Sequence, residues 1–411
     1  MKVTDYKRTH KAKLTALILM LSLLLSVFCS CGDDETEKVL PADFGTYGAD
    51  FARLIADKHP YRGAYSTDEA ATGIMIKDEF EALGYTVTSQ VFSGSSGQPS
   101  YNYYVKIEGK GFKDVDSKGV ATDVRRSVIV GAHYDTAFSS GDKDDSYSFD
   151  GISDNASGIG CLMTVAKNIK DYDLDFDVYL VAFGAESDNQ AGSRFFYSQL
   201  TSDIRNSIEV MFCIDSIYAG DKVYASSGFN SLDLSQKYSM RRKLYQAYDV
   251  AYDYMLGSIN GFYLYYNECG IITDLNGDGV DDVYREVTTV KSDYVVFDEA
   301  NIPVVFFDSG DYFFQNMDDF KETKNLHLQE FDGKISQTYL DSSEILDEVL
   351  NKNDVDRLEL RINNVAFVIM ETIMKGSDHA LTLTEYQELL KTPTEEVSST
   401  PSATASASIE G

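Results

Sequence analysis

Apolar runs that each end near a carboxylate or a histidine constrain the fold of this chain most strongly. Runs of this length, separated by helical stretches, are typical of buried parallel strands. The carboxyl ends of such strands form the edge of the sheet at which ligands collect. The sequence therefore predicts a functional site at that edge. The runs are residues 128–132, 176–183, 208–214 and 302–307, and the polar residues at or after their ends are His133, Glu186, Asp215 and Asp308.

This alternation predicts an α/β fold, a doubly wound three-layer domain with a mixed, mostly parallel sheet. An amphipathic helix is expected from about residue 68 to 83, and helical periodicity continues over 340–375. A pair of strands is expected at 85–92 and 101–108. With 411 residues, of which 43% are hydrophobic, the chain can bury one large core.

His133 and Asp135 stand two residues apart at the end of the first run. Residues i and i+2 of a strand point to the same side, so the carboxylate can orient the imidazole toward a metal ion. Asp154 opens the next predicted helix and can direct a second carboxylate to the same place. One imidazole with two or three carboxylates suits zinc in a hydrolase. The alternative is a polar cluster that is satisfied internally at a strand end.

Seven blocks in this region resemble one known family, the zinc aminopeptidases of the bacterial leucine aminopeptidase type, whose relatives include glutaminyl cyclases. They occur in the family's order across residues 130–330. The blocks are AHYD (132–135), SDNASG (153–158), VAFGAES (181–187), GS (192–193), CIDS (213–216), SDYVVF (292–297) and His327.

The resemblance implies a zinc aminopeptidase-like fold and peptide substrates. It implies that His133, Asp154 and Asp215 hold one zinc ion, and that Asp154 also bridges to a second zinc held by His327. Glu186 would be the general base that takes a proton from a zinc-bound water, because zinc brings the pKa of that water to about 7. An aminopeptidase acting on a peptide's amino end is the expected enzyme.

One departure from the family pattern affects the second zinc. The family has two glutamates in succession, the base and a zinc ligand, whereas this chain has Glu186 followed by Ser187. A serine hydroxyl is a poor zinc ligand, and Asp188 is a possible substitute. The alternatives are therefore a one-zinc glutaminyl cyclase-type transferase, or a surface-anchored binding protein that has lost activity.

The segment between these blocks that starts at Asp274 resembles an EF-hand-type calcium loop. Its oxygen-bearing positions have the right spacing, and Gly279 stands at the sixth position. Position 12 is Arg285, where the pattern expects a glutamate. Because Asn-Gly and Asp-Gly favour tight turns, the alternative is a hairpin tip. The candidate calcium ligands are Asp274, Asn276, Asp278 and Asp282.

The amino-terminal residues predict a lipoprotein. Residues 1–30 combine a basic start with an apolar stretch over 14–28, which is too short for an ordinary membrane span. Cys31 follows the small residue Ser30 and is the expected site of lipidation. The acidic residues after Cys31 resemble the surface-export signal of Bacteroidetes lipoproteins. We expect an outer-membrane lipoprotein exposed at the cell surface, with a periplasm-facing protein as the alternative.

The remaining boundaries follow from composition. Residues 31–45 are expected to be an acidic tether and 46–375 the catalytic domain. Residues 376–411 would be a tail whose Ser- and Thr-rich end is disordered. The net charge of −30 argues against nucleic acid as a partner, because phosphates would repel the chain. Membrane contact is expected only through a lipid at Cys31.

Overall fold

The computed structural model describes residues 40–94, 97–228, 237–267, 271–273, 279, 282–284, 286, 288, 290–312 and 321–391. The chain divides into two units, Met1–Asp43 and Phe44–Gly411. The predicted signal peptide, Cys31 and the tether up to residue 39 lie outside the described residues. The strands and the longer helices belong to the second unit.

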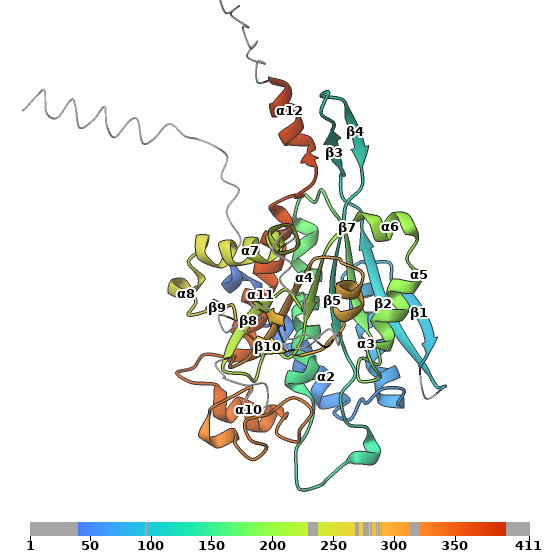
Figure 1. The fold of residues 1–411 in the computed structure, drawn as a ribbon. Coiled ribbons are helices and arrows are strands. Elements are labelled where there is room, and N and C mark those ends of the chain that lie inside the picture. Colours follow the sequence, from blue (N-terminus) through green and yellow to red (C-terminus); the bar gives the residue numbers. More distant parts are fainter. Residues whose placement is uncertain are drawn as a thin grey trace, which may run out of the picture. The chain divides into compact units, whose positions relative to one another are not determined.

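An eight-stranded mixed sheet forms the centre of this unit, as predicted (Figure 1). Its order is β1-β2-β6-β5-β7-β12-β8-β9, and β6, β5, β7 and β12 are mutually parallel neighbours. Antiparallel strands β1 and β2 extend one side, and β8 pairs antiparallel with β12 on the other. The strands are β1 (Thr88–Ser93), β2 (Pro99–Ile107), β5 (Ser127–His133), β6 (Asp177–Phe183), β7 (Ile208–Ile214), β8 (Lys222–Ser226), β9 (Leu264–Tyr265) and β12 (Val304–Gly310).

Apolar side chains of the central strands alternate between two buried clusters, because successive residues of a strand point to opposite faces. In β5, Val128 and Val130 join the larger cluster, and Ile129 joins the smaller one. The larger cluster includes residues of α2 (Tyr47–Lys58), α3 (Thr67–Ala82), α4 (Ser157–Asn168), α7 (Lys237–Asp253) and α11 (Arg357–Met374). The smaller cluster includes residues of α5 (Ala191–Gln199) and α9 (Val295–Glu299).

Shorter elements complete the described part of the chain. A three-stranded sheet has the order β13-β3-β4, and β10 and β11 form a hairpin. Among the described residues, none of the helices has both the length and the apolar character that crossing a membrane requires. The remaining strands are β3 (Phe112–Val115), β4 (Ala121–Val124), β10 (Ile271–Thr273), β11 (Asp282–Tyr284) and β13 (Leu381–Thr382). The remaining helices are η1 (Pro41–Phe44), η2 (Ser140–Asp142), η3 (Ile152–Ala156), η4 (Ile169–Asp171), α6 (Ser202–Ser207), α8 (Leu256–Ile259), η6 (Leu326–Leu328), α10 (Ser343–Leu350) and α12 (Leu383–Lys391).

The structure adds detail to two predicted segments near the carboxyl end. The helical stretch over 340–375 is two helices, α10 and α11, separated by an irregular segment. The predicted tail begins with regular structure, because Leu381 and Thr382 pair with β3 and α12 follows them. Residues 392–411, where disorder was expected, lie outside the described residues.

Candidate metal centre

Three buried side chains come together at the carboxyl edge of the sheet. His133 ends β5, Asp215 follows β7, and Asp154 lies in the short helix η3 before α4. One ligand atom from each lies within 4.8 Å of the other two. The imidazole Nε2 of His133 is 3.4 Å from Asp154 Oδ1 and 3.4 Å from Asp215 Oδ1. These are the three residues that the resemblance assigned to one zinc ion.

The donor set fits a metal ion. His133 is buried, and its Nε2 atom is among the buried polar atoms of the described residues that have no hydrogen-bond partner. Burial opposes the charged imidazolium, but Asp215 and Asp135 outweigh burial and raise the pKa of His133 well above its usual value. Burial, Asp215 and the nearby Asp341 raise the pKa of Asp154 in turn. A divalent cation among these groups would satisfy the nitrogen and neutralise the carboxylates.

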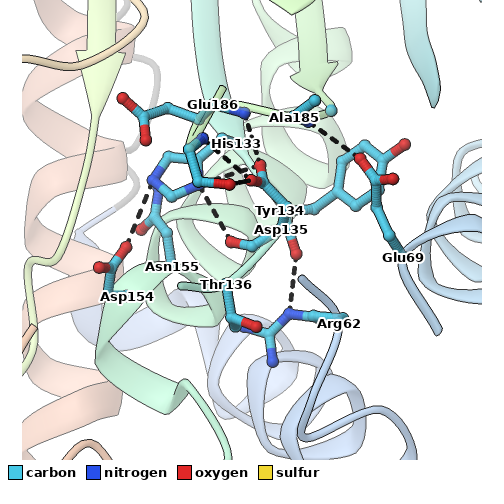
Figure 2. Close-up of polar contacts among 12 residues, drawn as sticks. Arg62, Glu69, His133, Tyr134, Asp135, Thr136, Asp154, Asn155, Ala185 and Glu186 are labelled. Atoms are coloured by element: carbon cyan, nitrogen blue, oxygen red, sulfur yellow. Dashed lines mark hydrogen bonds and ion pairs between the residues drawn. The ribbon is translucent and has the colours of Figure 1, made fainter. Parts of the chain in front are cut away.

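Asp135 connects the histidine to the turn that carries Glu186 (Figure 2). His133 Nδ1 lies 3.2 Å from the backbone carbonyl of Asp135 and 3.6 Å from its carboxylate Oδ1. The same carboxylate accepts hydrogen bonds from the backbone N–H of Glu186 (2.8 Å) and of Ser187 (3.1 Å), and from the Ser187 hydroxyl (2.8 Å). Asp135 therefore orients the imidazole and fixes the position of Glu186, as a positioning residue.

Glu69, which the sequence analysis did not single out, supports this turn from the other side. Its carboxylate is buried and accepts hydrogen bonds from the backbone N–H of Ala185 (2.9 Å) and from the hydroxyl of Ser100 (2.6 Å). Ala185 has a φ of 51°, a left-handed conformation that is unfavourable for alanine. Burial, with a contribution from Asp135, raises the pKa of Glu69 to about 8. Figure 2 shows Glu69 beside Ala185.

Glu186 lines the inner cavity together with all three candidate ligands, and the outer cavity together with His133 and Asp154. Gln190 Nε2 donates to its Oε1 at 2.9 Å. Burial raises the pKa of Glu186 to about 8, although His133 opposes this shift. A cation at the centre would lower that pKa, because a nearby positive charge favours the carboxylate. Glu186 is therefore placed as a proton acceptor beside the candidate metal ligands.

Asp341 and Asn155 hold the loops that carry Asp154 and Asp215. The carboxylate of Asp341 accepts hydrogen bonds from the backbone N–H of Ser153 (2.7 Å) and of Asp154 (2.8 Å). Asn155 Nδ2 donates to the carbonyl of Ile214 at 2.8 Å, directly before Asp215. The peptide bond between Asp154 and Asn155 is cis. The two candidate ligands thus depend on one buried hydrogen-bond network.

Two cavities adjoin this centre. An inner cavity of about 60 Å³ and an outer cavity of about 460 Å³ share His133, Asp154, Glu186, Val290, Lys291 and Gln337 in their linings. The outer cavity also includes Asp135, Thr136 and Ser187. The inner cavity also includes Asp215, Ser216, Asp308, Ser309, Glu322 and Ser336.

Among the described residues, His327 and Asp188 are not part of this buried group, and the second zinc ion stays a prediction. His327 lies in η6 with an exposed side chain, while its neighbour Leu328 is the residue that packs inward. Asp188 accepts a hydrogen bond from the Tyr65 hydroxyl at 2.6 Å. Ser187 donates its hydroxyl to Asp135. Gln337, with a φ of 60°, lines both cavities instead.

The calcium prediction remains a prediction. Asp274, Asn276 and Asp278 lie outside the described residues. Asp282 begins β11, where its backbone pairs with Thr273 of β10 in an antiparallel hairpin.

Comparisons with known proteins confirm the fold class and the resemblance inferred from the motifs. Peptidase family M28 matches residues 115–263. Over 342 residues the chain is 21% identical to the alkaline phosphatase isozyme conversion protein of Escherichia coli K12, covering 81% of this chain and 90% of that protein.

Solved structures share this fold at low sequence identity. The glutaminyl cyclase of an Acidobacteriales bacterium is 16% identical with a TM-score of 0.55, covering 83% of this chain and 98% of that one. The zinc aminopeptidase BSAP from Bacillus subtilis is 14% identical with a TM-score of 0.51, covering 82% and 98%. The fold is therefore that of zinc aminopeptidases and glutaminyl cyclases.

Proposed function

We propose that this chain uses one zinc ion to remove residues from the amino end of peptides. The support is its match to peptidase family M28 over its central third and its zinc aminopeptidase fold. His133, Asp154 and Asp215 would hold the zinc, and Glu186 would act as general base. Peptides are the proposed partners. The proposal extends a metallopeptidase-type assignment to a specific reaction and set of roles.

The observation that carries this proposal is the environment of His133 Nε2. This buried nitrogen has no hydrogen-bond partner among the described residues and lies 3.4 Å from a carboxylate oxygen of each of two aspartates. A buried imidazole nitrogen without a partner is costly, and its cost is removed when a metal ion is bound. The same cation would also neutralise the negative charge of Asp154 and Asp215.

Bound zinc would lower the pKa of a water molecule and polarise the carbonyl of the scissile peptide bond. The chain's own residues perform the remaining tasks. Glu186 would take the proton from the attacking water and later return it to the leaving amine. Asp135 holds the turn of Glu186 and Ser187 through the three hydrogen bonds described above, and it also contacts the imidazole of His133.

The direct test is turnover of leucine p-nitroanilide and of short free-amine peptides by the purified full chain, with and without added zinc. Glu186→Gln should keep the zinc and the fold but lower kcat by about 10²- to 10⁴-fold, the range of general acid–base groups. Glu348→Gln removes an exposed carboxylate of α10 and serves as the matched control. Absence of turnover on all free-amine substrates with zinc present would favour the binding-protein alternative.

A one-zinc transferase of the glutaminyl cyclase type is the second candidate. It is favoured by the neutral Ser187 and Gln337 at the cavities, and by the fold shared with glutaminyl cyclases. Incubation with a peptide that begins with glutamine separates the two reactions. Release of ammonia without cleavage of the peptide would identify the cyclase, whereas release of free glutamine would identify the aminopeptidase.

We also propose an outer-membrane location with a lipid on Cys31 and the catalytic domain facing outward. The sequence of residues 1–35 supports it: a basic start, a short apolar stretch, a small residue before Cys31 and acidic residues after it. Acyl chains on Cys31 would hold the protein at the membrane, because each buried methylene contributes about 0.8 kcal/mol.

A further inference from the structure

Two carboxylates of the inner cavity, Asp308 and Glu322, are neither candidate metal ligands nor the proposed base. Asp308 accepts from the Tyr312 hydroxyl, whereas Glu322 is held in place by backbone N–H groups. We propose that this carboxylate, Glu322, binds the α-ammonium group of the substrate and restricts the enzyme to peptides with a free amino end. This inference rests on the proposed function. It names the residue that would make the enzyme specific for a free amino terminus.

Glu322 is held in place by its surroundings. Its Oε2 accepts hydrogen bonds from the backbone N–H of Ile335 (2.9 Å) and of Ser336 (2.8 Å). Its own backbone N–H donates to the carbonyl of Gly333 at 2.9 Å, and its carbonyl accepts from Asp221. Both backbone donors to the side chain reach the same oxygen, Oε2, and Glu322 lines the inner cavity. A carboxylate fixed in this way needs little reorganisation to receive a cation.

A short chain of hydrogen bonds places Glu322 next to the metal ligands. Ser336, whose backbone N–H is bonded to Glu322, donates its hydroxyl to the hydroxyl of Ser216 at 3.2 Å. Ser216 in turn donates to Asp215 Oδ1 at 2.8 Å. Glu322 also raises the pKa of Asp154 through its charge. The carboxylate therefore lies in the same electrostatic environment as the candidate zinc.

The oxygen-rich lining suits an ammonium group better than a second zinc ion. An ammonium group has three N–H donors and needs three acceptors. The inner cavity offers the carboxylates of Glu322 and Asp308, the hydroxyls of Ser216 and Ser336, and the side-chain amide of Gln337, and Lys291 is the cation in the same lining. The residues expected at a second zinc ion besides Asp154, namely His327 and Asp188, do not line this inner cavity.

The sizes of the two cavities agree with binding of a chain end. The inner cavity measures about 60 Å³ and the outer about 460 Å³, and both border His133, Asp154 and Glu186. A group as small as an ammonium fits the inner space, whereas the continuing peptide fits only the outer one. A peptide would therefore enter with its amino terminus toward Glu322 and its first peptide bond near Glu186.

The test compares leucine p-nitroanilide with N-acetyl-leucine p-nitroanilide, for the full chain and for Glu322→Gln. The parent protein should prefer the free amine. Glu322→Gln should lower kcat/KM for the free amine by about 10- to 100-fold, the range of a hydrogen bond to a charged group, and leave the N-acetyl substrate unchanged. Bound zinc should stay the same. Glu348→Gln should change neither substrate.

Three results would overturn the inference. Equal losses on both substrates would assign Glu322 a structural role. A parent protein that cleaves the N-acetyl substrate as well as the free amine would remove the need for an ammonium site while leaving the peptidase function intact. A second zinc ion that is lost only in Glu322→Gln would show that the cavity holds a metal.

Binding measurements keep the inference testable when the parent turns over neither substrate or when Glu322→Gln does not fold. Calorimetry with 3-methylbutylamine and with the isosteric 3-methylbutanol compares a cation with a neutral group of the same shape. The parent should bind the amine at least 10-fold more tightly than the alcohol, and Ser336→Ala should weaken only amine binding. Equal affinity of the parent for the two compounds would overturn the inference. Tighter binding of the amine without any turnover would support the ammonium site and refute the peptidase function.

Discussion

At the scale of single residues, Asp135 contacts both the proposed base and a candidate metal ligand. It bonds to the backbone of Glu186 and Ser187 and to the Ser187 hydroxyl, and it lies beside the imidazole of His133. Groups that orient metal ligands typically contribute 10- to 100-fold to metal affinity. The geometry of the base and the affinity of the metal therefore depend on the same carboxylate.

We predict that Asp135→Asn lowers zinc affinity by about 10- to 100-fold and lowers kcat as well. An amide has one acceptor oxygen in place of two, so the N–H groups of Glu186 and Ser187 cannot both be satisfied. Competitive titration with a zinc chelator measures the affinity. Ser187→Ala is the control, since it removes only one of the three bonds and should have the smaller effect. An Asp135→Asn protein with parental affinity would refute this role.

Restoration of a second zinc site should need two substitutions. Ser187 and Gln337 are both neutral, and both line the outer cavity. Ser187→Glu alone supplies one charged ligand beside Asp154, whereas Ser187→Glu combined with Gln337→His supplies the carboxylate and imidazole that zinc prefers. We predict a second retained zinc only in the double variant. Two zinc ions in the parent after exhaustive dialysis would contradict this expectation.

The residues of the candidate centre were predictable from the sequence to different degrees. Local patterns located the residues at strand ends or at a helix start, which are His133, Asp135, Asp154, Glu186 and Asp215. Gln337 could not be found in this way, because a glutamine in a loop carries no ligand signal and the loop's path depends on tertiary contacts. His327 was predicted from the order of the family's blocks, and in the structure its side chain in η6 is exposed.

At the scale of elements, a buried arginine between α2 and α3 joins the loops around the site. Arg62 is 0% exposed and donates to the carbonyls of Tyr134 (2.8 Å), Asp150 (2.7 Å) and Gly151 (2.6 Å). It therefore connects the end of β5 with the segment that leads into η3 and Asp154.

We predict that Arg62→Met lowers the free energy of unfolding by about 3 kcal/mol or more, because several buried carbonyls lose their donors at once. The free energy of unfolding of Arg62→Lys should lie between those of Arg62→Met and the parent, since one ammonium group cannot reach all three carbonyls. Urea unfolding of the three proteins measures this difference. An Arg62→Met protein as stable as the parent would show that water replaces the guanidinium.

The strands that form the site were easier to predict than the elements that enclose it. β5, β6 and β7 are continuous apolar runs with clear ends, and β7 matches its predicted range. β12 continues past its apolar run to Gly310, because β8 supplies a pairing partner for Asp308 and Ser309. Pairing across long sequence separations of this kind leaves no local signal.

At the scale of the whole molecule, the proposed anchor predicts how the protein partitions. Cys31→Ala should release the protein from the detergent phase and abolish labelling with fatty acid, whereas Cys29→Ala should change neither. Protease added to intact cells should digest the parent's catalytic domain. Digestion only after permeabilisation would place the domain on the periplasmic side and refute the surface-export proposal.

The central claim is that one zinc ion, held by His133, Asp154 and Asp215, makes this chain an aminopeptidase. Titration of the metal-free full chain with zinc, while cleavage of leucine p-nitroanilide is followed, tests this claim most directly. The account predicts that activity rises linearly and reaches its plateau at one equivalent of zinc, and that His133→Ala stays inactive throughout. A plateau at two equivalents, or no activity at any zinc concentration, would contradict it.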